Sequence, residues 1–395
     1  MVIHWIWYAL LPKLSLRQKL ALLTHFPNPE DLYHMERYSH IPEITGEMAQ
    51  ALKDKDLAPA KAVIKSCGEK QIGIVTIGDV SYPSRLRNIT DAPLVLYYKG
   101  VLPDFDGQPV ISVVGTRKAS AYGLKNAERL SKQIAACGGL VVSGGAAGID
   151  TMALKGALEA GKQTVAVFGC GVDVVYPKTN RQLFVKIAEH GCLIAEYPPG
   201  TEPKPWQFPE RNRILSGLAD GVLVVEAPEK SGALITARNA FDQGRDVFVV
   251  PGNIDVATCT GSNALLQDCG AAVFSGWDVV KEYASIYPEA VENRKSEAPI
   301  LMVAEEISIP RAETDKKYID NSGPSAYSDL ENILSTLSEQ EKAIYLCLDS
   351  TARPADEVIA QVGLPAAVVL GVLTKLAIKG VVTNHPGGLV SANRS

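Results

Sequence analysis

The stretch PVISVVG, residues 109–115, is followed one helix-length later by LVVSGGAAGID, residues 140–150. Each is a short apolar strand that ends in a glycine-bearing turn, and a helix-like run follows each turn. Two such strands with the helix between them form a βαβ unit, and the turns after its parallel strands lie at the same edge of the sheet. We therefore expect the ligand-binding loops of this protein at that edge.

The alternation of strand and helix continues to about residue 274. Apolar strands such as TVAVFG at 164–169 and DVFVVPG at 246–252 are typical of a parallel sheet whose two faces are both covered by helices. Short β-like runs at 72–77 and 94–100 are expected to add an edge to this sheet. The pattern predicts an α/β fold with a Rossmann-like, doubly wound, mainly parallel sheet.

Four parts are expected along the chain. Residues 1–65 resemble a helical module of the SAM or helix-hairpin-helix type, although its turn at 41–47 has a glutamate where such motifs commonly carry their first glycine. That substitution disfavours a close approach of the backbone to phosphate, so DNA contact and plain packing both remain open. The extended Rossmann-like domain is expected at 66–281, an acidic flexible linker at 282–330 and a winged helix at 331–395.

The third helix of the expected winged helix is mostly Ala, Val and Leu. Its cations are limited to Lys375 and Lys379, so it lacks the side chains that usually read a DNA groove. A role in protein docking or packing is favoured over sequence-specific DNA reading.

Composition restricts the partners and the compartment. The formal net charge of −5 argues against a surface that attracts nucleic acid everywhere, and leaves a local basic groove possible. The seven cysteines form no CxxC pair, which predicts neither disulfides nor structural zinc and favours the reducing cytoplasm. The amino-terminal MVIHWIWYALL has no basic n-region and is too short to span a bilayer, so no membrane association is expected.

The tripeptide Gly115-Thr116-Arg117 ends the first strand. It offers backbone amides at the start of the next helix, a hydroxyl and a guanidinium that can hold phosphate bidentately. The next glycine is Gly123, so the GxGxxG fingerprint of a dinucleotide site is missing, and the chain contains no GxxxxGK[ST] motif. Taken alone, the tripeptide is equally compatible with a tight turn that bears a surface arginine.

The second strand ends in Ser143 and Gly144, which add a hydroxyl and room for a close backbone approach. Asp150 opens the following helix, and because an acid repels a bare anion we assign it an orienting role. Three further loops at expected strand ends carry cations, amides, hydroxyls or small residues, and one of them lies just ahead of a helix expected at 213–218. Their candidate residues are Lys178 and Asn180, then Arg211, Asn212 and Arg213, and finally Ser231, Gly232 and Thr236.

Each loop alone has an ordinary structural explanation. Five such loops at one edge of a sheet are better explained as a groove that follows a phosphate backbone. No catalytic residue, metal site or cofactor is predicted, because the histidines lie outside these loops and no HExxH or GxSxG motif occurs. Ser143 and Ser231 have no evident base nearby in the sequence.

Six segments resemble the DNA-processing protein A family, DprA or Smf, in order and spacing from about Tyr82 to Phe274. They are VVGTRKASAYG, VVSGGAAGIDTMALKGAL, TVAVFGCGVDVVYPKTNRQL, FPERNRILSGLADGVLVVEA, SGALITARNAFDQGRDVFVVPG and TGSNALLQDCGA. The helical amino-terminal module and the winged helix also match the family's common layout. One departure is Leu154, where the family usually has histidine, and we interpret that position as helix packing.

The resemblance implies a cytoplasmic, homodimeric protein without enzymatic activity. Such a protein binds and protects incoming single-stranded DNA and helps load the RecA recombinase during natural transformation. It also implies that the thirteen candidate residues from Gly115 to Thr236, other than Asp150, contact DNA phosphates. The alternative is a nucleotide-processing enzyme of the phosphoribohydrolase type, although SGALITAR stands where that family carries PGGxGTxxE with its catalytic glutamate. A third reading is a DNA-binding regulator centred on the winged helix.

Overall fold

The computed structural model describes residues 2–38, 41–42, 44–268, 270–292, 339–348, 353–362, 366–379, 381–385 and 389–392. The chain divides into two compact units, Met1–Glu305 and Glu306–Ser395. Most of the linker expected at 282–330 lies outside the described residues. Where the structure describes the chain, it contains no helix long and apolar enough to cross a membrane.

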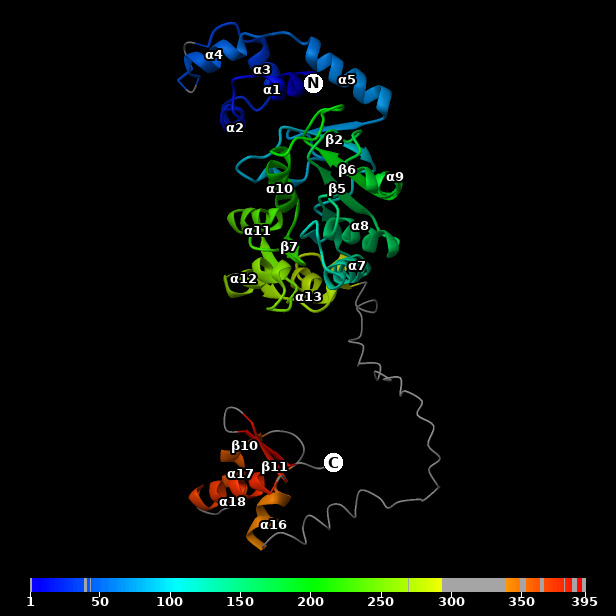
Figure 1. The fold of residues 1–395 in the computed structure, drawn as a ribbon. Helices are drawn as coiled ribbons and strands as arrows, with labels where there is room; N and C mark the ends of the chain where they lie inside the picture. The colour runs from blue at the N-terminus through cyan, green and yellow to red at the C-terminus, as the bar shows by residue number, and fades with distance from the viewer. Residues whose placement is uncertain are drawn as a thin grey trace, which may run out of the picture. The chain divides into compact units, whose positions relative to one another are not determined.

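A nine-stranded sheet forms the centre of the first unit (Figure 1). Its order is β1-β2-β6-β5-β4-β3-β7-β8-β9, parallel from β6 onward, with β2 antiparallel to both β1 and β6. The predicted doubly wound sheet with an added edge is therefore confirmed. The strands are β1 Gly73–Thr76, β2 Val95–Gly100, β3 Val110–Val114, β4 Leu140–Ser143, β5 Thr164–Phe168, β6 Cys192–Ala195, β7 Gly221–Val224, β8 Asp246–Val249 and β9 Ala271–Ala272.

Helices cover both faces of this sheet. Alternate residues of β3 point to opposite sides, so Ile111 and Val113 join one core cluster while Val110 and Val114 join the other. One face carries α7 Ala121–Ala136, α8 Ile149–Glu159, α9 Arg181–His190 and α13 Gly276–Val280. The other carries α6 Ser84–Arg87, α10 Gln207–Leu218, α11 Gly232–Asp242 and α12 Thr260–Asp268 (Figure 1). Three short 3₁₀ turns, η1 Lys178–Asn180, η2 Ala257–Cys259 and η3 Lys281–Tyr283, complete the connections.

In the described part of the chain, five helices precede the sheet: α1 Val2–Leu10, α2 Leu16–His25, α3 Pro29–His34, α4 Gly46–Leu52 and α5 Ala58–Lys70. Side-chain caps fix the starts of α2 and α3, since Ser15 and Gln18 form a capping box before α2 and Asn28 accepts from the Glu30 amide before α3. Ile6 and Tyr8 of α1 share a core cluster with Tyr97 of β2, so these helices pack on the antiparallel edge of the sheet.

The boundary expected at residue 65 falls inside α5, which continues to Lys70 and was not predicted. Part of the helix-hairpin-helix turn expected at 41–47 lies outside the described residues.

Two further expectations are corrected. Helix α10 begins at Gln207, six residues before the predicted start, because Pro209 occupies its third position, where the backbone amide has no partner inside the helix. The packed unit also extends beyond residue 282, the expected start of the linker. Helix α14 Pro288–Glu292 belongs to it, and Tyr283 and Val291 are buried in the cluster under α7.

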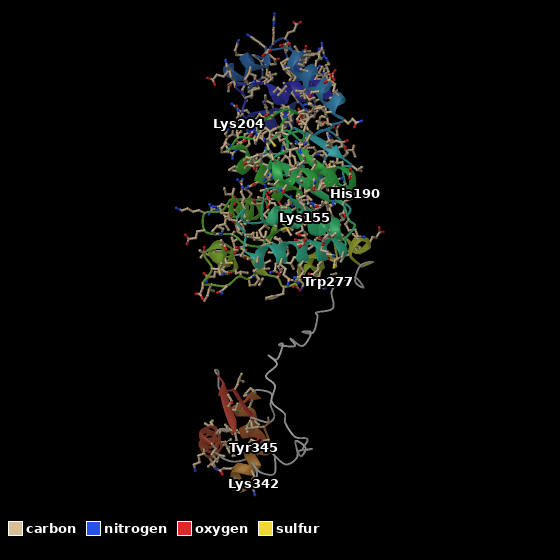
Figure 2. All side chains as sticks on the ribbon, turned by 45° about the vertical axis from the view of Figure 1, so that its right-hand side comes forward. Lys155, His190, Lys204, Trp277, Lys342 and Tyr345 are labelled. Atoms are coloured by element: carbon tan, nitrogen blue, oxygen red, sulfur yellow. The ribbon has the colours of Figure 1, made fainter. Side chains whose placement is uncertain are left out.

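The second unit is a winged helix. Its helices are α16 Glu339–Leu346, α17 Ala355–Val362 and α18 Ala366–Ile378, and its small sheet has the order β10-β12-β11. The strands are β10 Arg353–Pro354, β11 Val382–His385 and β12 Leu389–Ala392, while the turn expected at 386–388 lies outside the described residues. Tyr345, labelled in Figure 2, is buried in the core between these helices.

Candidate phosphate-binding site

The chain reverses direction across the sheet at β3. It runs from β3 through β4 and β5 to β6, and then returns to the other side of β3 with β7 and β8. In open α/β sheets this reversal leaves a crevice at the carboxyl ends of the two strands, where ligands bind. A cavity of about 520 Å³ lies here, lined by the loops after β3, β4 and β7 and by α10. We call it the β3–β7 cavity.

The loop after β3 forms one wall of the β3–β7 cavity. A side chain at Gly115 would collide with Ile149 and the Glu226 carbonyl, so this position needs glycine. The Thr116 amide donates to the Glu226 carbonyl at 2.7 Å and ties the loop to the end of β7. Arg117 is exposed, and its guanidinium carbon lies 5.3 Å from the ring centroid of Phe208, within cation–π range.

The start of α11 forms the opposite wall. The Ser231 hydroxyl accepts from the Ala233 amide at 3.2 Å and caps the helix, and Asn212 donates to the Gly232 carbonyl at 3.1 Å. The amide-rich end of an α-helix attracts anions. Thr236 is buried one turn further on and donates its hydroxyl to the Gly232 carbonyl at 3.4 Å. Lys230, in the loop before the helix, is exposed at the cavity.

A buried acid and a buried arginine form the floor. The Arg211 guanidinium donates to the Gly144 carbonyl at 2.6 Å and to the Val167 carbonyl, while the Asp150 carboxylate accepts from the Ala146 amide at 3.3 Å. A side chain at Gly144 would run into both charged groups. The position therefore needs glycine so that Arg211 and Asp150 can pack against the backbone.

Burial controls the protonation of these two groups. It raises the pKa of Asp150 to about 6, although the guanidinium groups of Arg211 and Arg117 favour the charged carboxylate. It also lowers the pKa of Arg211 to about 10, and the Asp150 carboxylate opposes that change. Among the described residues that line the cavity, Asp150 is the only acid. The site therefore carries excess positive charge at neutral pH.

The structure brings nine of the fourteen candidates into the lining: Gly115, Thr116, Arg117, Asp150, Arg211, Asn212, Ser231, Gly232 and Thr236. The other five lie elsewhere. Ser143 is buried and donates to the Val113 carbonyl at 2.7 Å, and Gly144 supports the floor. Asn180 is also buried and donates to Gly145 and Thr151. Lys178 is exposed at the start of η1.

Arg213 is the candidate most fully engaged by other side chains. Its guanidinium lies 2.8 Å from Glu196 and 3.2 Å from Asp91. Because both acids hold its side chain, Arg213 connects α10 to the loop before β2 and to the end of β6. Its predicted contact with phosphate stays a prediction that these ion pairs do not support.

Sequence reasoning missed three lining residues of consequence, Lys118, Lys230 and Phe208. The two lysines are sequence neighbours of the predicted residues Arg117 and Ser231, and this adjacency could have identified them. Phe208 also faces Tyr176, with ring centroids 5.3 Å apart, and Tyr176 is exposed. This aromatic pair offers flat surface beside the cations. No ion pair joins Arg117, Lys118 or Lys230 to a described acid.

Glu226, at the end of β7, is fully buried and does not line the cavity. Its carboxylate accepts from the Ser120 hydroxyl at 2.7 Å and from the Ser120 amide at 3.2 Å. A side chain at Gly123 would collide with it. Glu226 therefore fixes the start of α7 beneath the loop that carries Arg117.

The chain is similar to proteins of known sequence and structure. The family model "DNA recombination-mediator protein A" matches residues 73–284, and the model "DprA winged helix domain" matches residues 330–388. Protein Smf of Synechocystis sp. is 33% identical over 329 residues, which cover 81% of this chain and 80% of that protein.

Two solved structures are also similar. DNA processing protein A from Streptococcus pneumoniae is 35% identical, with a TM-score of 0.63 over 71% of this chain and 98% of that one. The protein of the same name from Helicobacter pylori is 28% identical, with a TM-score of 0.50 over 55% of this chain and 97% of that one. The Helicobacter pylori protein is described as having a unique single-stranded DNA binding mode.

Proposed function

Because the chain belongs to the DNA recombination-mediator protein A family, also called DprA or Smf, we propose that it binds single-stranded DNA at the β3–β7 cavity. The observation that carries this proposal is the convergence of three exposed cations, Arg117, Lys118 and Lys230, on a crevice that also receives the amino terminus of α11. Cations and helix amides are the donors that bind phosphate oxygens.

The aromatic pair favours a single strand over a duplex. Phe208 lies beside Arg117 and faces Tyr176. Unpaired bases stack on such rings while the phosphates contact the cations. Bases in a duplex are already stacked and hidden from these rings. Binding is therefore expected to depend on salt and to vary little with base sequence.

The finer function belongs to the same proposal. Acting as a cytoplasmic homodimer, the protein protects incoming single strands and helps load RecA during natural transformation. Two cavities on one strand would strengthen binding through effective concentration. Support for these roles comes from family membership, whereas the cavity supports the DNA contact itself.

We propose that binding is not accompanied by catalysis. Glu226, the acid at the end of β7, is held by Ser120 beneath the cavity wall. One observation favours the phosphoribohydrolase alternative, namely that Asp150 combines a pKa raised to about 6 with a place in the cavity lining. Incubation with nucleoside monophosphates tests this alternative. Base release above that of an Asp150→Asn variant would establish an enzyme.

The winged helix contributes little DNA contact in this proposal. On α18, Lys379 pairs with Glu341 at 2.8 Å, while Val368 and Leu370 are exposed. An apolar exposed surface with few available cations fits a protein partner better than a nucleic acid. The DNA-binding regulator considered from the sequence is therefore not favoured.

The decisive experiment compares single- and double-stranded oligonucleotides of one sequence over a salt series, using fluorescence anisotropy and the full-length chain. We expect tighter binding to the single strand, and a linear decrease of log affinity with log salt. Equal affinity for both forms would contradict the proposal.

A further inference from the structure

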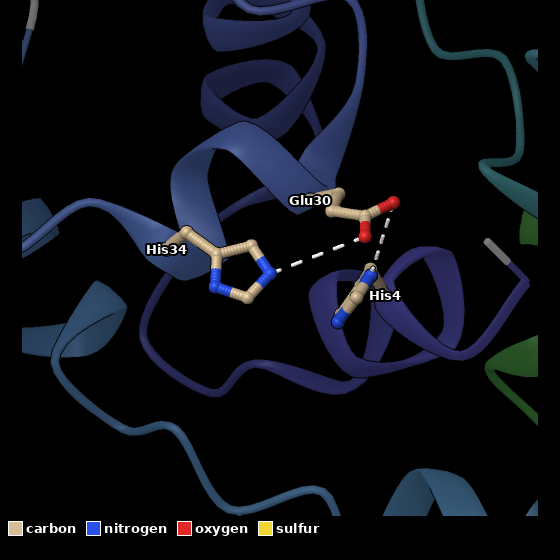
Figure 3. Close-up of side chains that lie close together, drawn as sticks. All are labelled: His4, Glu30 and His34. Atoms are coloured by element: carbon tan, nitrogen blue, oxygen red, sulfur yellow. Dashed lines mark ion pairs between the residues drawn. The ribbon is translucent and has the colours of Figure 1, made fainter.

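Two helices of the amino-terminal module bring a histidine, a glutamate and a second histidine together (Figure 3). His4 Nδ1 on α1 lies 3.6 Å from one carboxylate oxygen of Glu30 on α3, and His34 Nε2 lies 4.0 Å from the other. One donor atom of each residue lies within 4.8 Å of the donors of the other two. No metal site was expected here from the sequence, which contains no HExxH motif.

The local structure explains why the three donors converge. Glu30 and His34 are four residues apart on α3, so both project from one side of that helix. Pro29 at the first helical position and the Asn28 cap fix the start of α3 beside Glu30. His4 approaches from α1, which packs against α3 through the ring of Tyr33, 4.8 Å from the His4 ring.

His4 supplies a second, independent observation. It is only 4% exposed, and its buried Nδ1 has no hydrogen-bond partner although it is directed at Glu30. Buried polar atoms in folded proteins are almost always satisfied, so an unsatisfied imidazole nitrogen that faces a carboxylate needs an explanation. A metal ion bound between these atoms provides one, because it accepts the lone pairs of the nitrogen and of the carboxylate together.

We propose that His4, Glu30 and His34 form a binding site for a divalent transition metal, with Zn²⁺ as its natural occupant. Two imidazoles and one carboxylate are a typical ligand set for Zn²⁺, whereas Mg²⁺ and Ca²⁺ prefer oxygen ligands alone. Tetrahedral bonds of about 2.1 Å place neighbouring donors about 3.4 Å apart. The observed spacings, which reach 4.8 Å, must therefore contract when the ion binds.

The site is closed on one side and open on the other. The side chains of Glu30 and His34 are 27% and 66% exposed, against 5% for His4. The exposed His34 side chain can therefore adjust to the ion, and a water molecule completes the tetrahedron from the solvent side. The ion joins α1 to α3, two helices of the module packed against the sheet edge.

Without metal, the same residues would form a carboxylate that bridges two histidines. A metal site and a metal-free cluster differ in whether the protein binds the ion and in whether added metal stabilises the fold. A metal that binds the folded state raises the midpoint of thermal unfolding, and that increase requires all three ligands.

The test uses the full-length chain without a histidine tag, stripped with a chelator and titrated with Co²⁺ as a spectroscopic substitute that Zn²⁺ then displaces. We expect one Co²⁺ per chain, ligand-field bands, and no thiolate charge-transfer band. His34→Ala and Glu30→Gln should each weaken binding at least about tenfold, the scale on which even indirect supports of metal ligands act. His34 is exposed, so its loss leaves the fold intact.

His190→Ala is the matched control, since His190 is an exposed histidine at the end of α9, outside the amino-terminal helices (Figure 2). It should bind Co²⁺ like the wild type, and Zn²⁺ should raise the unfolding midpoint of both. The proposal is overturned if His34→Ala binds within twofold of the wild type, if His190→Ala loses as much affinity, or if a thiolate band shows that cysteines hold the ion.

Discussion

Replacement of Arg117 by alanine tests whether the β3–β7 cavity binds DNA phosphate. The side chain is exposed, contacts the Phe208 ring and pairs with no described acid, so its loss leaves the core intact. A hydrogen bond to a charged group contributes about 1.5–3 kcal/mol. Loss of one guanidinium–phosphate contact therefore corresponds to roughly 10- to 150-fold weaker binding.

The salt dependence identifies the contact more sharply than the affinity. Each phosphate neutralised on a single strand contributes about 0.7 to the slope of log affinity against log salt. Arg117→Ala should lower the slope by about that amount, equally on thymine and adenine homopolymers, because the contact is to the backbone. Arg117→Lys keeps the charge and should restore the slope, while the affinity recovers only in part because the bidentate fork is lost.

Fluorescence anisotropy over a salt series measures both quantities, and circular dichroism verifies the fold of each variant. Arg17→Ala is the matched control, since Arg17 is an exposed arginine on α2 outside the cavity lining. It should keep the wild-type affinity and slope. A folded Arg117→Ala protein that also keeps both would show that Arg117 binds no phosphate, and the reasoning from the cavity would fail.

Three further outcomes are expected. Phe208→Ala removes a stacking surface without removing charge, so single-strand affinity should fall by about 1–3 kcal/mol in anisotropy titrations while the salt slope stays constant. Wild-type affinity should rise as pH falls through about 6, because protonation removes the negative charge of Asp150 from the cavity, and Asp150→Asn should flatten that profile. Deletion of residues 331–395 should leave most single-strand affinity intact. If the deletion abolished that affinity, the DNA site would have to lie on the winged helix.

The sheet could be predicted because its strands are uninterrupted apolar runs. β4 begins at Leu140 and ends at Ser143 as expected, since turn residues bound it on both sides. Helix α5 was missed because its lysines and alanines, such as Lys61 and Ala62, show helix propensity but little apolar periodicity. The early start of α10 was missed because a run of prolines indicates a loop, although a proline in the first turn costs no hydrogen bond.

The candidate site was predictable only as far as the backbone determines it. Residues in the turns after β3 and β7 reach the cavity because parallel strands end at one edge. Whether a candidate side chain faces the cavity or is held inside the protein depends on partners that are distant in sequence. Arg213 could not be recognised as a structural arginine without Asp91 and Glu196, and Ser143 could not be recognised as buried without Val113.

The charges in this site divide by burial into two roles. The Arg211 guanidinium donates to the Gly144 and Val167 carbonyls, so these protein hydrogen bonds replace hydration before any ligand binds. Arg117 and Lys230 remain solvated, and a phosphate that reaches them releases water and counterions. Substitution of Arg211 would expose unpaired carbonyls and Asp150 in the floor, and would report on folding rather than on recognition. Arg211, one of the phosphate contacts expected from the sequence, therefore builds the cavity, and we expect the exposed cations at its mouth to govern affinity for DNA.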